Sequence, residues 1–507
     1  MENGGTGTAT TEEAPGLESE NLRLKTENLE LKQENDGLKE ENARLVLAIA
    51  ALQERLKVLE HRQRKNSENS SKPPSSDGYR KPAPKNLREK SGRKPGGQRG
   101  HPGHHMEVPH EPDAVVTHFP GRCVGCPNLA SCTAGQRFEC GESRYVVDVV
   151  VETKVTEHRS MRAKGCPLDK DNAREPASAI SAGAFPVGVS AHVQYGDSVA
   201  VVSAALNTYG AMSCSRISGL MRSLCGITIS AGTVSYMTSR ASEKTVPALA
   251  QIRERLVESA VCHFDETGSR VGGKTRWVQN ASNSGYTYQT LGPSRGCGGI
   301  DFNGVLPRFK GISVHDCWTP YWKYGVRHGI CCVHILRELK GIEDLEPDHV
   351  WPRLFRIFLL SMKAEKEEAI DGGGTCMPVE KLEGYSERYD RIMRLADDEC
   401  PMPVERHKPG GREKLGEERS LIERLILRKD SVYRFVREFE VPFSNNLAER
   451  DIRNVKVKTK VSGCFRTEEG AQRYLNIMSY LSTAGKHGVD AFTALKEALN
   501  GNSTVVL

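Results

Sequence analysis

The sequence contains no run of 18 or more apolar residues, so it offers no segment that could cross a membrane as a helix. Residues 1–15 lack the basic and then apolar layout of a secretory signal. We therefore expect a cytoplasmic protein that has no membrane partner. In a protein that is not secreted, the 15 cysteines are expected to be thiols or metal ligands rather than disulfides.

The positive charge is concentrated in one part of the chain, which at 507 residues is long enough for several domains. The net charge is +6, but residues 62–105 alone carry 12 Lys or Arg and three acids, a net charge of +9. Such a segment favours a polyanion as its partner, and a soluble, self-repelling linker is the alternative. We expect residues 62–110 to be a disordered linker that contacts double-stranded DNA through three cations lying among Gly and Pro: Arg93, Lys94 and Arg99.

A leucine repeat follows residues 1–16, which we expect to be disordered. Leucine recurs at every seventh position from Leu17 to Leu59. The positions four residues after these leucines are asparagine as far as Asn42 and apolar beyond it. This pattern predicts a two-stranded parallel coiled coil over residues 17–61, and hence a homodimer. The alternative is a single solvated helix, which would leave the leucine stripe uncovered.

Residues 111–175 contain a Cys-x-x-Cys pair at Cys123 and Cys126, and further cysteines follow. Because four nitrogen or sulfur ligands close a structural Zn²⁺ site, we expect a small zinc-binding module here. Its ligands are predicted to be four of Cys123, Cys126, Cys132, Cys140 and Cys166. Thiols without metal are the alternative, since a second Cys-x-x-Cys pair is missing. Alternating apolar residues between 144 and 158 predict a β-ribbon in this module.

Residues 176–258 have a helical pattern. An amphipathic stretch at 216–224 is followed by a turn at 226–230, and Ser230 is the predicted N-cap of a second helix that begins at Ala231. This spacing is typical of a helix-turn-helix. Two packed helices that make no DNA contact are an equally good interpretation.

Two apolar stretches each end in an aspartate. Residues 260–265 and 311–316 are predicted β-strands that place Asp265 and Asp316 at their ends. A turn is expected directly after the first strand, at Thr267-Gly268.

Further strands are predicted at 275–281 and 285–291, in an antiparallel meander with the first strand. A helical segment that begins at Asn446 carries Glu449. The boundaries that follow are 259–345 and 441–485 for a mixed α/β core, 346–440 for a helical insertion, and 486–507 for a C-terminal helix and tail.

Three acids on separate segments are candidate ligands for a pair of Mg²⁺ ions. Cleaving and joining phosphodiesters needs an activated oxygen nucleophile and a stabilised leaving oxygen, and two divalent metals held by a few carboxylates serve both needs. We expect Asp265, Asp316 and Glu449 to be these ligands. Asp265 is preferred over Glu266 because it shares a strand face with His263. Taken singly, each acid could instead be an N-cap, a turn residue or part of a surface ion pair.

The helix that carries Glu449 offers further polar groups. Asn446 and Arg453 lie three residues before and four residues after Glu449, so the spacing places all three on one face. This face would set a metal-binding carboxylate beside a phosphate-binding guanidinium.

Several short motifs follow one another along nearly the whole chain. Besides the leucine repeat and the cysteine pair, they are residues 70–77, residues 92–101, residues 263–268, Cys331-x-x-His334 with Arg337, and residues 445–453 followed by Gly463 and Gly470. With these motifs the sequence resembles the transposases of the insertion sequence 66 family, of the TnpC type.

The resemblance implies a multidomain α+β protein with an N-terminal coiled coil, a zinc-binding module, a helical domain and a ribonuclease H-like catalytic core with a helical insertion. In that core Asp265, Asp316 and Glu449 would form a DDE triad. Cys331 and His334 would support the site, although a core thiol and a helix-start histidine are the alternatives. The implied reaction is cleavage of a phosphodiester at the end of the element, followed by attack of the freed 3′-hydroxyl on target DNA.

The same resemblance gives Arg450 and Arg453 a role in holding phosphates or positioning the helix. A structural salt bridge to Asp451 or Glu449 is the alternative. The zipper would bring two DNA ends into one complex, and the sequence leaves open whether accessory proteins take part. Two rival functions are a non-catalytic, dimeric, zinc-containing DNA-binding protein and a ribonuclease H-type nuclease acting on RNA. The three acids count against the first of these.

Overall fold

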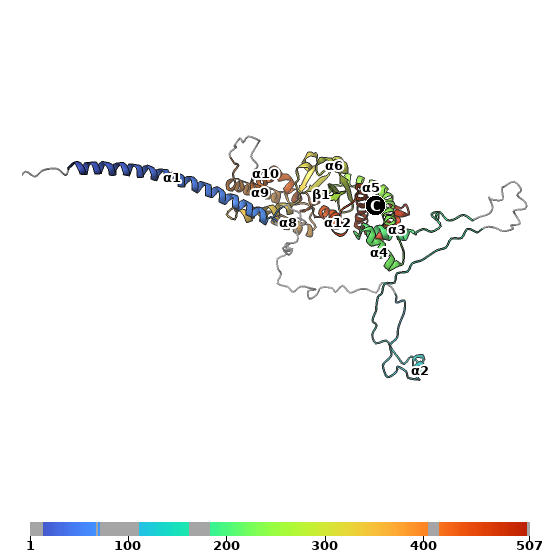
Figure 1. Cartoon of the computed structure of the whole chain (residues 1–507). Coiled ribbons are helices and arrows are strands. Elements are labelled where there is room, and N and C mark those ends of the chain that lie inside the picture. The colour runs from blue at the N-terminus through green and yellow to red at the C-terminus, as the bar shows by residue number, and fades with distance from the viewer. Residues whose placement is uncertain (1–13, 67–68, 71–110, 162–182, 404–414, 504–507) are drawn as a thin grey trace, which may run out of the picture.

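The computed structural model describes residues 14–66, 69–70, 111–161, 183–403 and 415–503. The described chain is mostly helical and contains one mixed five-stranded sheet, so the protein is of the mixed α+β kind (Figure 1). The described helices include none with the length and apolar character that a bilayer crossing requires.

The sheet has the strand order β3-β2-β1-β4-β5. Strands β2 and β3 run antiparallel to their neighbours as a meander with β1, whereas β4 and β5 run parallel to β1 and to each other. The strands are β1 (Val261–Val271), β2 (Lys274–Ser282), β3 (Thr287–Gly292), β4 (Ile312–His315) and β5 (Arg327–Ile330). The meander predicted from the sequence is therefore confirmed.

The turn predicted at Thr267-Gly268 is wrong, because β1 continues to Val271. Residues beyond Asp265 pair with β2, for example Thr267 with Val278, so the backbone there has ladder partners. The chain reverses instead at Gly272 and Gly273, whose φ angles of 54° and 78° suit glycine.

The two faces of β1 are covered by different helices. Phe264 belongs to the same core as residues of α5 (Ala231–Val257), α6 (Cys297–Asn303) and the short helix η3 (Leu306–Arg308). Val271 packs instead with Ile452 of α12 (Asn446–Ser462) and with residues of α13 (Glu468–Lys486). The period-two alternation of a strand thus places β1 between two helical layers.

The helical region before the sheet has its elements where the sequence predicts them. It contains α3 (Asp197–Asn207), α4 (Cys214–Cys225) and α5, and α14 (Ala491–Leu499) packs on α3. The Ser230 hydroxyl accepts a hydrogen bond from the Thr233 amide, which confirms the predicted N-cap of α5.

Strands β4 and β5 lie against a second helical layer, which has a core of its own. Its elements are α7 (Cys332–Leu345), α8 (Trp351–Asp371), α9 (Val379–Glu399), α10 (Glu417–Leu427) and α11 (Lys429–Arg437). Large aromatic side chains fill this core, and Trp351, Phe355, Phe358 and Tyr389 are completely buried. This region is helical, as the sequence predicts for residues 346–440.

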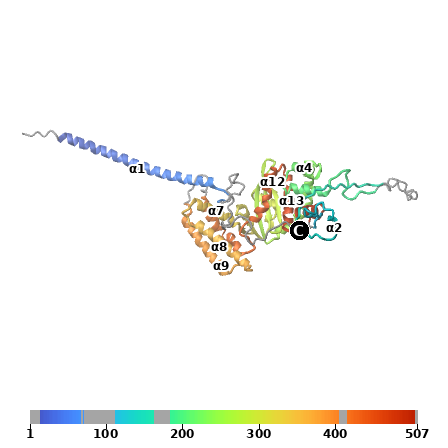
Figure 2. The same ribbon diagram turned by 90° about the horizontal axis from the view of Figure 1, so that it is seen from below.

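The first helix, α1 (Ala14–Arg64), projects away from the rest of the molecule in both views (Figures 1 and 2). Its leucine stripe faces solvent in the single chain, and Leu31, Leu38 and Leu45 expose 56%, 53% and 53% of their surface. Near its C-terminal end, Lys57 forms an ion pair of 2.6 Å with Glu346, just after α7. The zipper helix is thus attached to the helical insertion at one end.

Residues 111–161 contain one short helix, α2 (Leu129–Ala134), which lies apart from the sheet in Figure 1. The predicted β-ribbon at 144–158 is wrong, because none of these residues lies in a strand. Val146, Val149 and Val150 are 86–90% exposed. Alternating valines favour a strand only where a partner strand or a core covers them, and neither does so here.

The close approach of β4 to β1 leads to a prediction about Gly311. A Cβ atom at this position would lie 2.4 Å from the Ala260 carbonyl oxygen and 2.6 Å from that of Ser259. Gly311→Ala should therefore push the two strands apart and lower the free energy of unfolding by about 1–3 kcal/mol. Chemical denaturation measures this. Gly219→Ala on α4 is the matched control, since nothing lies within 4 Å there. Equal stability of Gly311→Ala and wild type would contradict this packing.

Candidate active site

Asp265 and Asp316 come together because β1 and β4 are parallel neighbours. His263 pairs with Val314, and each aspartate lies two residues further along the chain, Asp265 within β1 and Asp316 directly after the last residue of β4. Parallel strands are about 4.8 Å apart, and residues two apart share a face. The two carboxylates therefore emerge side by side at the same end of the sheet.

The backbone turns sharply after Asp316. The Trp318 amide donates to Asp316 Oδ1 at 3.0 Å, and the Cys317 amide donates to His315 Nδ1 at 3.1 Å. Cys317 has a φ of +72°, which a non-glycine residue rarely adopts. The Nδ1 atom of the buried His328 lies 3.0 Å from His315 Nε2, and this contact fixes the histidine ring on which the turn depends. Backbone strain of this kind persists where the surrounding structure fixes it, and it is typical of functional sites.

Glu449 enters the site from the first turn of α12, and the residue before this helix holds it in place. Asn445 is 1% exposed and makes three hydrogen-bond contacts to two separate segments. Its amide nitrogen donates to the Phe264 carbonyl at 2.8 Å, its side-chain oxygen lies 2.8 Å from His263 Nδ1, and its backbone N–H donates to Cys331 Sγ at 3.1 Å. These bonds attach the start of α12 to β1 and to the end of β5.

The electrostatics show that the acids share one environment. The pKa of Asp265 is raised well above its usual range, first by burial and then by the charges of Glu266, Asp316 and Glu449. Its described hydrogen bond comes from the Glu266 amide, at 2.9 Å. A buried carboxyl group whose pKa is raised by three neighbouring acids marks a strong candidate site for a divalent cation.

Cys331 and His334 lie beside Glu449, as the sequence predicts. One ligand atom from each of the three residues lies within 4.8 Å of the others. His334 Nδ1 is 3.9 Å from Glu449 Oε1, and among the described residues neither buried atom has a hydrogen-bond partner. Burial lowers the pKa of His334, but Cys331, Asp316 and Glu449 outweigh burial and raise it to about 9. Buried polar atoms are rarely left unpaired, so this pair of atoms is suited to an ion or an incoming group.

Glu266 was set aside in the sequence prediction because it faces away from Asp265, yet it contributes to the site. Its carboxylate is 2% exposed, accepts from Tyr321 Oη at 2.6 Å, and forms an ion pair of 2.9 Å with Arg295. Burial and the charge of Asp316 raise its pKa to about 7. The Arg295 guanidinium also stacks on Trp318 at 4.2 Å. The position of Glu266 directly after the predicted ligand Asp265 was the sequence signal that could have indicated its part in the site.

Other predicted site residues lie elsewhere. Asn446 is exposed, and the prediction that it supports the site through a shared face with Glu449 is not borne out by any contact; Asn445 makes these contacts instead. Arg450 and Arg453 are exposed, and neither forms an ion pair with another described residue. Asp451, the alternative partner of these arginines, pairs with Lys486 at 2.7 Å.

The structure does not bring the zinc-ligand candidates together. Among the described residues, Cys123, Cys126, Cys132 and Cys140 do not form a group of three or more close ligands. Cys166 lies outside the described residues, so the structural zinc site stays a prediction. Outside them as well are the cations predicted to contact DNA, Arg93, Lys94 and Arg99.

Acids gathered at the ends of parallel strands, with a histidine and a guanidinium beside them, define a candidate site of the metal-binding carboxylate class, suited to anionic substrates. The transposase IS66 family matches residues 192–473, more than half of the chain, and the protein belongs to this family. The match includes all three predicted acids. Family membership gives the protein a role in transposition and DNA as its partner. Residues 17–107 match a family of unknown function (DUF6444), and no curated protein matches the chain.

Asn445 and Asn446 form a natural pair for a test. Asn445→Ala should leave His263 Nδ1 and the buried Phe264 carbonyl without partners, at a cost of about 1–3 kcal/mol for each buried group. We expect a clearly lower midpoint of thermal unfolding and reduced strand transfer. Asn446→Ala removes an exposed amide and should change neither quantity. If the two variants behave alike, Asn445 does not hold α12 at the site.

Proposed function

We propose that the protein is a DDE transposase that cleaves DNA at the ends of its element and joins the freed ends to target DNA. Asp265, Asp316 and Glu449 form the triad. The observation that carries this proposal is the shared environment of three acids that lie up to 184 positions apart in the sequence, read from Asp265 to Glu449. A DNA-binding protein without catalysis has no need for such a cluster.

The sheet supports a ribonuclease H-like core for this chemistry. Asp265 sits on β1 and Asp316 directly follows β4, and these are inner strands of the order β3-β2-β1-β4-β5. Helices cover both faces of β1, so the carboxylates are held on rigid elements. The proposed core consists of residues 259–345 and 441–485, with the helices of 346–440 as an insertion.

The triad has the chemistry that a pair of Mg²⁺ ions requires. Hard cations prefer oxygen ligands, and the three acids provide them; the pKa of Asp265 is raised by burial and by neighbouring charges that include Asp316 and Glu449. When bound, two such ions would activate an oxygen nucleophile and stabilise the leaving oxygen. The carboxylates of Asp265, Asp316 and Glu449 would hold them.

The chain's other groups orient the reacting phosphate. His334 lies beside Glu449, and its raised pKa keeps it cationic at neutral pH. A ring N–H of His334 can therefore donate a hydrogen bond to a phosphate oxygen. Arg295 is 45% exposed and lies at the edge of the site against Glu266 and Trp318, where it can contact the DNA backbone. Arg450 and Arg453, exposed on α12, offer two more cations for the same purpose.

The projecting zipper helix supports a dimeric enzyme. A solvated single helix gains nothing from a leucine at every seventh position, whereas a second copy would bury that stripe. Dimerisation would place two active sites in one complex, as joining two DNA ends requires. The ion pair between Lys57 and Glu346 would transmit the position of the zipper to the insertion beside the sheet.

The triad is tested with isosteric substitutions. Asp265→Asn, Asp316→Asn and Glu449→Gln should each abolish nicking of a labelled element end in Mg²⁺, while DNA binding and unfolding stay as in wild type. EDTA should have the same effect on the wild-type protein, because the ligands would then have no ion. The product expected from wild type is a nick that leaves a 3′-hydroxyl.

Glu440→Gln is the matched control, because this exposed acid lies outside the sheet and the cluster. It should nick DNA at the wild-type rate. Full activity in any one of the three triad variants would reject that residue as a ligand.

The zipper is tested at the leucine positions. Replacing Leu31, Leu38 and Leu45 by Lys should change the mass in light scattering from about twice 56.0 kDa to 56.0 kDa, because buried charge is not tolerated at these positions of a coiled coil. The control replaces Thr26, Gln33 and Glu40 by Lys, two residues after leucine positions of the repeat and on the outer face. An unchanged mass in the leucine variant would refute the zipper.

A further inference from the structure

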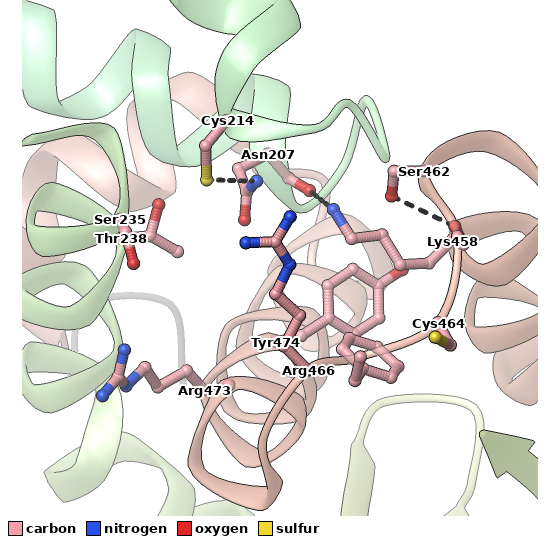
Figure 3. A pocket seen from close by; sticks show the side chains of 13 residues that line it. Asn207, Cys214, Ser235, Thr238, Lys458, Ser462, Cys464, Arg466, Arg473 and Tyr474 are labelled. Atoms are coloured by element: carbon pink, nitrogen blue, oxygen red, sulfur yellow. Dashed lines mark hydrogen bonds between the residues drawn. The ribbon is translucent and has the colours of Figure 1, made fainter. Parts of the chain in front are cut away.

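A cavity of about 180 Å³ lies where the helical region meets the connection between α12 and α13 (Figure 3). One wall comes from α3, α4 and α5, through Asn207, Cys214, Ser235 and Thr238. The opposite wall comes from the end of α12, residues 463–466 and the first turns of α13. None of the three triad acids lines it, so it is separate from the candidate active site.

The cavity lining is cationic. It includes Lys458, Arg466 and Arg473, and no carboxylate. Lys458 Nζ donates to the carbonyls of Asn207 and Met212 at 2.8 and 3.0 Å, so this ammonium already has structural partners. The positive charge available to a ligand therefore comes from the two arginines.

Both arginines are available for a new partner. Arg466 points toward Asn207 and Cys214 across the cavity, and Arg473 points toward the helix that carries Ser235 and Thr238 (Figure 3). Among the described residues, neither guanidinium donates a hydrogen bond. The nearest acid along the helix, Glu469, is fully exposed, and its pKa is lowered first by its own backbone amide and the Thr467 hydroxyl and only then by Arg473.

We propose that this cavity binds a phosphate of the DNA backbone through Arg466 and Arg473. The inference rests on the proposed function, which supplies DNA as the substrate. Drug-sized ligands and cofactors occupy pockets of about 300–1,000 Å³, so this cavity suits a small anionic group rather than a nucleotide. Two guanidiniums with the Ser235 hydroxyl nearby are donors of the kind that contact phosphate oxygens, whereas the Thr238 hydroxyl already donates to the Val234 carbonyl.

The cavity is fixed relative to the active site through β1. Phe465 forms a bridge with Val271, and its backbone exchanges hydrogen bonds with Gly272 and Arg270 at 2.9 and 3.1 Å. Asp265 lies six residues before Val271 on the same strand, a distance of about 20 Å at the usual rise. That distance corresponds to about six base pairs of duplex, so the phosphate bound here would lie about six base pairs from the cleavage point on the same DNA.

The proposal is tested by DNA binding in the absence of Mg²⁺, which does not depend on catalysis. We expect the full-length Arg466→Gln, Arg473→Gln double variant to bind a labelled duplex of random sequence more weakly than wild type in fluorescence anisotropy. The slope of log K against log salt concentration should become shallower by about 0.9, since the two arginines contact one phosphate and each lost phosphate contact contributes about 0.9. Unfolding should not change, because no described hydrogen bond is removed.

The control is the Arg391→Gln, Arg437→Gln double variant, which loses the same number of positive charges on α9 and α11 of the insertion. A slope that changes equally in the control, or not at all in the double variant, overturns the proposal. A duplex with one methylphosphonate at successive positions localises the contact. Wild type should lose affinity at one position where the double variant loses none, and equal losses in both proteins would overturn the assignment. Failure of strand transfer in wild type would instead remove the proposed function and leave this binding result standing.

Discussion

Mutual repulsion among carboxylates at one end of the sheet is the constraint on which the candidate active site depends. Two of the four acids have a cation beside them: Glu266 has Arg295, and Glu449 has His334 close by, whereas Asp316 accepts only a backbone amide, which carries no net charge. Asp265 accepts a hydrogen bond from the Glu266 amide, and the charges of the other three acids raise its pKa. The negative charge that remains uncompensated therefore lies between Asp265 and Asp316, where a cation gains most by binding.

A repelling cluster stays together only if its frame is rigid. Two of the acids emerge from adjacent parallel strands, which fixes their spacing through the backbone ladder. The third comes from a helix that is distant in sequence, so its position depends on side chains. Asn445 supplies that attachment with bonds to β1 and to Cys331, in a place where water does not compete. The polar core under the site is thus a structural requirement of the acid cluster.

Much of this arrangement follows from sequence pattern, and what does not follow depends on tertiary partners. The short apolar runs before Asp265 and Asp316 indicate strands, and both strands form, but only β4 ends there, whereas β1 continues past Asp265 to Val271. The extension of β1 beyond Thr267 was not predicted, since only pairing with β2 makes that polar segment a strand. Likewise, Asn445 and Asn446 are identical in kind, and only the packed helix decides which of them is buried. At the valine-rich segment 144–158 a strand was predicted that does not form, because the alternating pattern suits a strand but no partner strand pairs with it.

Strand β1 has a second role that becomes clear when its two ends are compared. At one end it presents Asp265 to the acid cluster, and at the other its final residue is bridged to Phe465, next to the arginines of the cationic cavity. Between Asp265 and Val271 every residue of β1 pairs with β2, and helices cover both faces of the strand, so the distance between acids and cavity is set by the number of residues between them. A duplex bound across both would be held at a fixed register. Its backbone would meet positive charge at the cavity and negative charge at the acids, and the second contact becomes favourable only when cations neutralise that cluster. Under the two proposals, productive engagement of DNA would depend on metal occupancy, while the cavity contact itself would not.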